Sequence, residues 1–220
     1  MPLDLGVLIS GTGTNLQAIL DATRAGRLDA RIRIVVSNRA DAAGLRRAEG
    51  AGVPTRVVPH GEFPDRESFE RALVDALREA GASWVVLAGF MRLLTPEFLG
   101  AFPDRVLNIH PALLPAFPGV DAQAQTLAYG VHVAGCTVHL VDAGTDTGPI
   151  IAQAVVPVDD DDTRETLQQR ILAREHELLV LALGWIAEGR LEVMPPRTAG
   201  GRPRVRVRGA STAIGVVGDA

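Results

Sequence analysis

Apolar runs and amphipathic segments take turns along the first half of the chain. Short runs rich in Leu, Val and Ile predict buried strands, and the segments between them repeat apolar residues at helical spacing. The predicted strands are residues 3–10, 32–37, 55–58 and 84–88 and a run that starts at Val106, and the predicted helices are a segment from Leu16 and residues 42–51 and 66–80. This order predicts right-handed βαβ units in a doubly wound, mostly parallel sheet, which is a Rossmann-like α/β fold.

The second half predicts an antiparallel portion of the same fold. Residues 123–129 predict a short helix, 135–142 and 150–158 predict strands, and 163–187 predict a long helix. Because no useful helix separates the two strands, we expect them to pair in antiparallel fashion through the loop between them. Cys136 alternates with polar residues on the first of these strands and is expected to be a small buried hydrophobe.

Domain boundaries follow from the same pattern. We expect a single domain over residues 1–198, with an N-terminal half near 1–100 and a C-terminal half near 101–198, and a peripheral tail over 199–220. From residue 195 on, the chain is rich in Gly, Pro and Arg, which predicts a surface strand or a loose tail.

Four consecutive acids, Asp159 to Asp162, precede the long helix. They predict a solvated cap that favours the positive end of the helix dipole, with an oxygen-ligated metal as the alternative.

Composition narrows the class of protein. The chain has 220 residues, 47% of them hydrophobic and 22% charged, and a formal net charge of −4. Its single cysteine excludes an internal disulfide framework and fits a reducing compartment. We see no basic block that predicts nucleic-acid binding, no signal peptide and no membrane-length apolar run. The expectation is a soluble, cytoplasmic protein.

Candidate chemistry is densest in residues 106–119, where an apolar run leads into three prolines and a glycine. Asn108 and His110 are two residues apart, so on a strand they point to the same side. An imidazole can move a proton, and a carboxamide can donate hydrogen bonds to a carbonyl oxygen. The alternative is a strand end whose Asn and His satisfy local backbone groups.

A glycine-rich loop, Gly11-Thr12-Gly13-Thr14-Asn15, follows the first predicted strand and leads into a helix. Free backbone N–H groups at such a helix start can bind a phosphate. The loop lacks the lysine of a Walker motif and the third glycine of the dinucleotide fingerprint. An ordinary turn with Asn15 or Thr14 as helix N-cap is the alternative. Together with residues 89–94 and 108–110, this loop is expected on the rim where parallel strands end.

Four motifs in register resemble one known family. They are Ser10-Gly-Thr-Gly-Thr-Asn15, Ala88-Gly-Phe-Met-Arg-Leu-Leu94, Asn108-Ile-His-Pro-Ala-Leu-Leu-Pro115 and Asp142-Ala-Gly-Thr-Asp-Thr-Gly-Pro149. Over roughly residues 3–198 the chain is similar to phosphoribosylglycinamide formyltransferase, the folate-dependent glycinamide ribonucleotide transformylase of purine synthesis. The resemblance implies formyl transfer from 10-formyltetrahydrofolate, as co-substrate, to the amine of glycinamide ribonucleotide, without a metal.

The resemblance also implies that the half near 1–100 binds the nucleotide and that the half near 101–198 binds the folate, and it implies roles for individual residues. Asn108, His110 and Asp146 match the catalytic trio, and Glu175 matches a contact to the ribonucleotide. Three residues match the loop that binds the ribonucleotide phosphate: Gly13, Thr14 and Asn15. The positions that match the folate pocket, besides Asn108 and Asp146, are Arg66, Met91, Arg92, Leu93, Leu94, Val141, Asp142, Ala143, Gly144 and Thr145. The implied partners are these two small molecules, with no nucleic acid and no membrane, and the chain is expected to be a monomer or a homodimer.

The residue types suit this reaction on chemical grounds. When an amine attacks a formyl carbon, negative charge develops on the carbonyl oxygen, which Asn108 and His110 can meet with hydrogen-bond donors. Asp146 can support a charged His110 and help to pass the proton to the leaving nitrogen. The alternative for Asp146 is a turn residue that bonds to its own loop.

One position departs from the family, because Gly119-Val120-Asp121 stands where Gly-x-His is usual. If Asp121 lies close to Asp146, the two like charges raise one pKa; a harmless surface replacement is the alternative. His139, on a predicted strand, is expected to be packed or hydrogen-bonded rather than catalytic.

Two related activities and one different class remain to be weighed. Methionyl-tRNA formyltransferase is expected to need a longer chain with a basic RNA-binding domain, and formyltetrahydrofolate deformylase an additional N-terminal domain. A non-catalytic binding or sensing module of the same fold is the alternative of a different class, supported in the sequence by Asp121.

Overall fold

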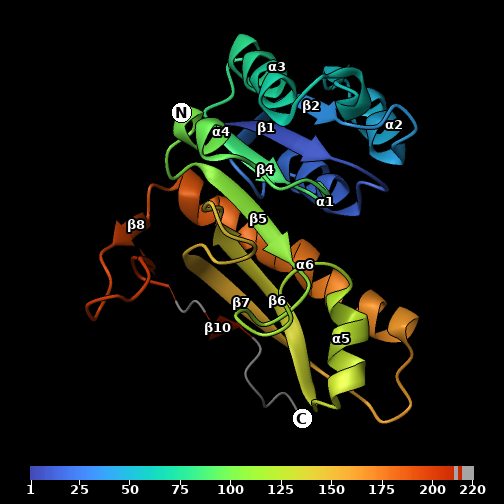
Figure 1. The fold of residues 1–220 in the computed structure, drawn as a ribbon, viewed down its shortest axis with the longest axis vertical. Coiled ribbons are helices and arrows are strands. Elements are labelled where there is room, and N and C mark those ends of the chain that lie inside the picture. Colours follow the sequence, from blue (N-terminus) through green and yellow to red (C-terminus); the bar gives the residue numbers. More distant parts are fainter. Residues whose placement is uncertain (211–212, 215–220) are drawn as a thin grey trace. The chain divides into compact units, whose positions relative to one another are not determined.

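The computed structural model describes residues 1–210 and 213–214. The chain forms two compact units, Met1–Asn108 and Ile109–Ala220 (Figure 1). The boundary falls inside one strand, so the strand that carries Asn108 and His110 begins in the first unit and ends in the second.

The first unit is built on a parallel sheet. Its strands are β1 (Leu3–Ile9), β2 (Ala30–Ser37), β3 (Thr55–Val57), β4 (Trp84–Leu87) and the first three residues of β5 (Val106–His110). Their order is β3-β2-β1-β4-β5, and all neighbouring pairs are parallel. The chain adds β2 and β3 on one side of β1 and then adds β4 and β5 on the other side. Sheets of this kind bind ligands where the strand order switches, which is between β1 and β4 here.

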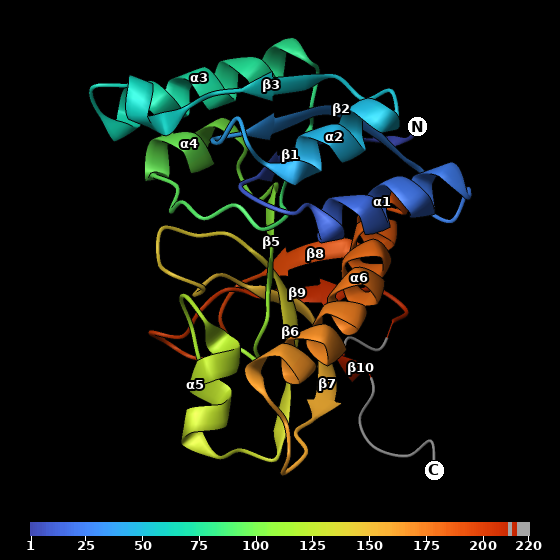
Figure 2. The ribbon, with the colours of Figure 1, turned by 90° about the vertical axis from the view of Figure 1, so that its right-hand side faces the viewer.

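Helices and one 3₁₀ turn connect these strands, and the longer helices pack against the sheet. They are α1 (Thr14–Arg24), α2 (Ala43–Gly50), the 3₁₀ turn η1 (His60–Glu62), α3 (Arg66–Glu79) and α4 (Pro96–Ala101). Helix α1 packs against α2, and α3 packs against α4 (Figure 2). The strand residues at the centre, such as Val7, Val35 and Val86, are fully buried, which explains their continuous apolar runs. The predicted order of strands and helices is confirmed.

The second unit holds an antiparallel pair of strands under one long helix. It contains α5 (Ala122–Tyr129), β6 (Val133–Leu140), β7 (Ile150–Pro157) and α6 (Arg164–Ala187). Strands β6 and β7 are antiparallel, as predicted, and α6 packs on both. Cys136 is fully buried in β6, where burial raises the pKa of its thiol to about 12, with the nearby charge of Glu175 adding to the effect.

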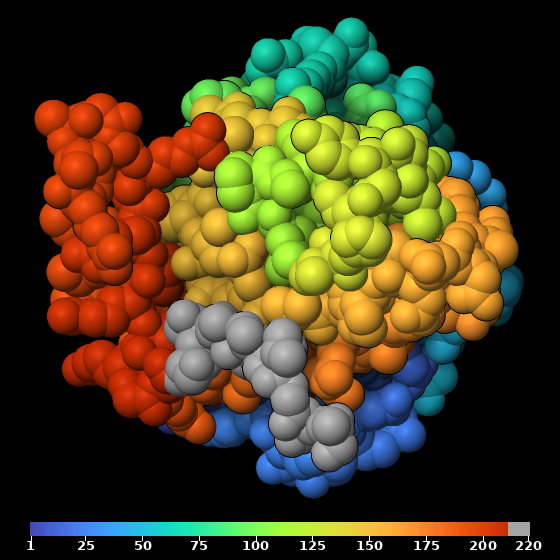
Figure 3. All heavy atoms as spheres, turned by 90° about the horizontal axis from the view of Figure 1, so that it is seen from below, coloured from blue at the N-terminus to red at the C-terminus, as the bar shows by residue number. Residues whose placement is uncertain are grey.

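The segment after α6 adds short strands to this unit. Strands β8 (Leu191–Met194) and β9 (Arg204–Val207) form an antiparallel pair, and this part of the chain is drawn in red tones in Figure 3. Strand β10 (Ala213–Ile214) pairs in parallel with β7. Two strands therefore lie within the predicted tail, of which residues 211–212 and 215–220 are outside the described residues.

The prediction that all four acids before α6 form a solvated cap is wrong for Asp162, whose side chain is 2% exposed. Both of its oxygens accept from the Arg170 guanidinium, at 2.8 and 3.0 Å. This pairing, together with the Asp159 backbone N–H, lowers the pKa of Asp162 to about 2. The helix itself is capped by Thr163, which exchanges two hydrogen bonds with Thr166. Arg170 lies 8 residues after Asp162, about two helical turns, so the local sequence pattern does not reveal the pair.

No helix in the described part of the chain is long and apolar enough to cross a membrane.

Candidate active site

His110 ends strand β5 and is almost fully buried, with 5% of its side chain exposed. Its Nε2 lies 2.9 Å from the carbonyl oxygen of Phe117, which can only accept, so Nε2 carries a proton. Its Nδ1 lies 3.4 Å from Oδ2 of Asp146. Both ring nitrogens thus face acceptors, and the ring is oriented to hold a second proton between itself and the carboxylate.

Asp146 lies between two imidazoles. Besides His110, it faces His139, whose Nε2 is 3.7 Å from Oδ1 of Asp146. The backbone N–H of Gly119 donates to Oδ2 of Asp146 at 2.8 Å. The prediction that His110 and Asp146 belong to one site is consistent with this geometry, because strand β5 and the loop after β6 bring them together.

His139 is the residue of this cluster whose proximity the sequence did not reveal. It lies on β6, its Nδ1 is 2.9 Å from the carbonyl oxygen of Leu140, and it is 2% exposed. The expectation that His139 is packed and hydrogen-bonded is therefore confirmed. Its alternation with Cys136 and Val138 was the available signal, because it puts His139 on the other face of a strand that leads to Asp146.

Burial and charge act in opposite directions on this cluster. Burial lowers the pKa of His110 below its ordinary value of 6.5, while the Phe117 carbonyl and the Asp146 charge oppose that shift and His139 adds to it. Burial works against the charged form of Asp146, yet the pKa of Asp146 is lowered because His139, the Gly119 N–H and His110 outweigh it. At neutral pH the pair is therefore a neutral imidazole beside a carboxylate, which is the state of a general base.

Besides the Gly119 contact, the loop that carries Asp146 has hydrogen bonds among its own residues. The Asp142 carboxylate accepts from the hydroxyl of Thr147 at 2.6 Å and from the N–H of Gly144 at 3.1 Å. A Cβ at Gly148 would lie 1.8 Å from the carbonyl oxygen of Leu140, so only glycine fits there. Asp146 itself has φ +53°, a left-handed conformation that is uncommon for non-glycine residues and is found at functional sites.

The ion pair of Asp121 is with Arg164 and not with a residue of the cluster around Asp146. The side chain of Asp121 is 45% exposed and pairs with Arg164 at 2.8 Å. The Arg164 guanidinium lowers the pKa of Asp121, and the pKa of Asp146 is lowered as well, so neither carboxyl has the raised pKa that two close like charges would cause. The alternative, a surface replacement, agrees with these contacts.

The glycine loop of the first unit lies between β1 and α1. Helix α1 begins at Thr14 with Gly13 as N-cap, and no side chain caps it, so the alternative of an Asn15 or Thr14 cap is wrong. Gly13 has φ +70°, and a Cβ there would lie 2.6 Å from Cα of Gly44. The loop is thus pressed against α2, and it precedes the positive end of the α1 dipole, where an anion is favoured.

The guanidinium group of Arg47 lies beside this loop, and its Nε donates to the carbonyl oxygen of Thr12 at 2.9 Å. Asn15 itself is buried on α1.

The loop after β4 carries the predicted folate-pocket residues of the first unit. Met91 and Leu93 are 70% and 60% exposed, whereas Leu94 is buried. Arg66, at the start of α3, donates through Nη2 to the carbonyl oxygen of Leu93. Arg92 is exposed on the same loop.

The loop after β6 carries the remaining predicted pocket residues in the second unit. Asp142 and Asp146 are the two with the contacts given above. Val141 precedes Asp142, and Ala143, Gly144 and Thr145 lie between the two acids. Glu175 lies on α6 and is 7% exposed.

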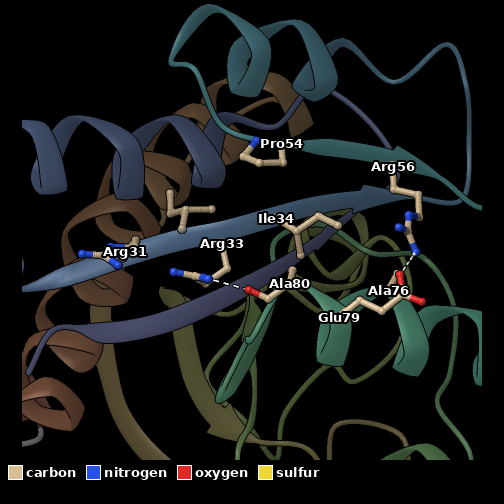
Figure 4. Close-up of a pocket in the computed structure, with 9 residues that line it drawn as sticks. Arg31, Arg33, Ile34, Pro54, Arg56, Ala76, Glu79 and Ala80 are labelled. Carbon is tan, nitrogen blue, oxygen red and sulfur yellow. Dashed lines mark hydrogen bonds and ion pairs between the residues drawn. The ribbon is translucent and has the colours of Figure 1, made fainter.

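A separate hollow of about 460 Å³ lies in the first unit between β2, β3 and α3 (Figure 4). Arg33 donates to the carbonyl oxygen of Ala80 at 2.7 Å, and Arg56 pairs with Glu79 at 2.9 Å. The residues that line this hollow are different from those of the candidate site.

Among the described residues, no group of three His, Cys, Asp or Glu side chains could hold a metal ion.

Comparisons with known proteins bear on the whole chain. Residues 4–183 match the family model described as formyl transferase. A phosphoribosylglycinamide formyltransferase of Mycobacterium tuberculosis is 50% identical over 186 residues, which cover 84% of this chain and 86% of that protein. The crystal structure of glycinamide ribonucleotide transformylase 1 from Symbiobacterium toebii is 53% identical, covers 94% of both chains and superposes with a TM-score of 0.88.

Some relatives are much longer. The trifunctional purine biosynthetic protein adenosine-3 of Bos taurus is 48% identical over 185 residues, which cover 84% of this chain but only 18% of that protein. The chain thus spans about a fifth of the length of these trifunctional relatives. The match to the family model extends over well more than half of the chain, and the fold agrees with it in both units. The chain belongs to the formyl transferase family.

Proposed function

We propose that this protein transfers the formyl group of 10-formyltetrahydrofolate to the amine of glycinamide ribonucleotide, a step of purine synthesis. The observation that carries the proposal is the buried His110–Asp146 pair, set in a chain that is similar over 84% of its length to a phosphoribosylglycinamide formyltransferase. The two small molecules are the proposed partners, without metal, nucleic acid or membrane. The proposed setting is the cytoplasm, with the chain as a monomer or homodimer.

In the proposed reaction, a bond forms between the amine nitrogen of the acceptor and the formyl carbon, and the bond from that carbon to the folate nitrogen breaks. The amine loses one proton and the leaving nitrogen gains one. A neutral His110 takes the proton, forms an ion pair with Asp146, and then returns the proton to the leaving nitrogen. A positioned acid–base group of this kind contributes about 10²- to 10⁴-fold to a rate.

Negative charge on the carbonyl oxygen needs hydrogen-bond donors. We assign this role to the carboxamide of Asn108, which precedes His110 by two residues on β5. One such donor is worth about 3–4 kcal/mol in comparable sites. His139 adds a third group around Asp146 and keeps that carboxylate from turning away from His110.

Binding of the two substrates is assigned to the loops. Gly13, Thr14 and Asn15 hold the ribonucleotide phosphate at the uncapped start of α1, with the charge of Arg47 nearby. Glu175 contacts the ribonucleotide. The folate is bound by Arg66, by the loop with Met91, Arg92, Leu93 and Leu94, and by the loop with Val141, Asp142, Ala143, Gly144, Thr145 and Asp146.

A formyl-transfer assay with both substrates tests the proposal. The wild-type protein is expected to turn over, and H110A to lose about 10²- to 10⁴-fold in kcat. His132 offers a matched control because it is an exposed histidine of the same unit, so H132A is expected to keep wild-type rates. Binding of both ligands by the wild-type protein without turnover would contradict the proposal and favour a non-catalytic module.

A further inference from the structure

Glu70 is a buried acid for which the proposed reaction has no use so far. It lies on α3 between Phe69 and Leu73, on the face that packs into the core, and it is 2% exposed. A buried carboxylate is costly unless donors surround it. The hydrogen-bond partners of Glu70 therefore indicate its role.

The partners of Glu70 are Thr95, at the end of the loop after β4, and Arg66, one turn earlier on α3. The Glu70 carboxylate accepts from the backbone N–H of Thr95 at 3.0 and 3.1 Å and also from the Thr95 hydroxyl. Nε of Arg66 donates to Oε1 at 3.1 Å. All of these partners are donors, and Thr95 is the residue that ends the loop and caps α4.

Arg66 connects Glu70 to the middle of the loop. While its Nε pairs with Glu70, its Nη2 donates to the carbonyl oxygen of Leu93. One buried carboxylate thus orients a guanidinium whose other edge holds the loop backbone. Such a bridged arrangement is more rigid than a single ion pair, because the planar guanidinium makes two directed contacts at once.

The beginning of the loop is held by a second buried contact. The carbonyl oxygen of Gly89 accepts from the backbone N–H of Ser10 at 3.1 Å, and the Ser10 hydroxyl accepts from the N–H of Met91 at 2.9 Å. The same hydroxyl donates to Asn38 at 2.7 Å. The loop backbone is therefore fixed at both ends.

Between these anchors the loop presents large apolar side chains to solvent. Met91 and Leu93 are among the most exposed large apolar residues of the described chain. Side chains of this kind on a fixed backbone mark a surface that a flat apolar ligand covers. A fixed backbone also removes the cost of ordering the loop when the ligand binds.

We infer that Glu70 is a positioning residue for the formyl donor, which fixes the loop of Met91–Leu94 through Thr95 and Arg66. This inference rests on the proposed function, and it assigns part of the donor affinity to a residue that the donor does not touch. It also gives Arg66 a second task, since the arginine supports the loop backbone besides any contact of its own with the donor.

The substitution E70Q tests the charge at constant size. A carboxamide can accept with its oxygen only, so its NH2 group must face either the Arg66 donor or the Thr95 N–H. We expect the KM for 10-formyltetrahydrofolate to rise about 5- to 20-fold, with the KM for glycinamide ribonucleotide within about twofold of wild type. E67Q is the matched control, because Glu67 is an exposed acid in the first turn of the same helix.

A variant on the loop side tests the same contact from its other partner. T95V removes the hydroxyl that donates to Glu70 and that also caps α4, and T95S keeps both contacts, so the thermal unfolding midpoints of the two variants are compared as well. T95V is expected to raise the donor KM by about 3- to 10-fold and T95S by less than about twofold. In the double variant the effects of E70Q and T95V should be less than multiplicative, since both break one contact. If E70Q yields no folded protein, the T95V and T95S pair carries the same test.

Direct binding of tetrahydrofolate, measured by calorimetry, gives a readout that does not need turnover. Weaker binding in E70Q than in E67Q, at comparable thermal unfolding midpoints, supports the inference. An E70Q protein that matches E67Q in donor KM and tetrahydrofolate binding overturns it, and so does an equal rise in both KM values. A wild-type protein that neither transfers the formyl group nor binds tetrahydrofolate overturns the proposed function, and with it the inference.

Discussion

The loop after β4 and the loop after β6 are held in different ways. The first is fixed by side chains that are distant in sequence, since Glu70 is 25 residues from Thr95 and Ser10 is 81 residues from Met91. The second adds to its distant contacts, from the Gly119 N–H and from Arg202, an internal one between Asp142 and Thr147 at 2.6 Å. Both carry residues assigned to the donor, so the difference lies in how each loop is kept in shape.

The difference matches what each loop presents. The loop after β4 offers exposed apolar side chains, Met91 and Leu93. The loop after β6 offers a charge, Asp146, in a left-handed conformation. A charge that must meet one ring nitrogen needs tight local geometry, whereas an apolar surface needs only a stable position. Damage to the second loop should therefore lower kcat, and damage to the first should raise KM.

The largest effect is expected from D146N. Asparagine has the size of aspartate and tolerates φ near +53°, so the loop should keep its shape. Without the carboxylate charge, a protonated His110 loses its counter-ion. We expect kcat to fall by about 10²- to 10⁴-fold in the formyl-transfer assay.

Both KM values of D146N should stay within about threefold of wild type if the loop is intact. H132A, at an exposed histidine of the same unit, serves as control. Near-normal turnover in D146N would remove Asp146 from the mechanism and with it the division of labour between the loops.

The pH profile should show the next largest effect. Because the pKa of His110 is lowered, the ring is neutral above 6.5 and becomes protonated only below its own, lower pKa. We expect log kcat/KM to be flat from pH 7 downward to that pKa and then to fall about tenfold per pH unit, as a general base requires. An inflection above 6.5 would contradict the neutral resting state.

The same shift affects stability with a definite sign. The unfolded chain takes up the proton at about 6.5 and the folded chain at a lower pH, so the stability from a neutral His110 is present above 6.5 and is lost as the pH falls through the folded pKa. In D146N the charge that opposes the shift is gone, and an NMR titration should find the pKa of His110 lower still.

Much of the fold could be predicted because its signals are local. The apolar runs of β1, β2 and β4 are buried on both faces, and the turn after β6 has too few residues for a crossover helix. The pairing of Asn108 and His110 on one strand follows from the two-residue period alone. The family motifs then supplied Asp146, which no spacing argument joins to His110.

Contacts between segments distant in sequence could not be predicted in this way. Glu70 was visible only as an acid on the apolar face of a helix, next to Phe69, and nothing local names Thr95 as its partner. Asp162 is buried because Arg170 folds back on it, and His139 joins Asp146 because β6 ends at the loop. Each of these depends on tertiary packing, which decides the environment of a polar side chain more than its own neighbours do.

A smaller effect is expected from T147V, which tests the internal hold of the loop after β6. Valine has the shape of threonine but cannot donate to Asp142. A hydrogen bond of this kind is worth about 1 kcal/mol net, so kcat should fall about 3- to 10-fold. T147S keeps the hydroxyl and is expected to match wild type. A change confined to the donor KM would mean that this loop, like the other, only presents a surface.

The smallest effect is expected from D121N, which asks whether the departure from the family belongs to either loop. Asp121 is at φ +56°, which asparagine also adopts, so the substitution removes the charge without new backbone strain. The charge is half exposed and is paired with Arg164 rather than with the cluster around His110. We therefore expect kcat and both KM values to stay within about twofold of wild type, the usual range for a surface substitution. R164Q removes the other partner of the same pair and should behave alike. A shift of the pH profile in D121N, with R164Q unchanged, would mean that the Asp121 charge reaches His110, and the site would then extend beyond the two loops to the start of α5.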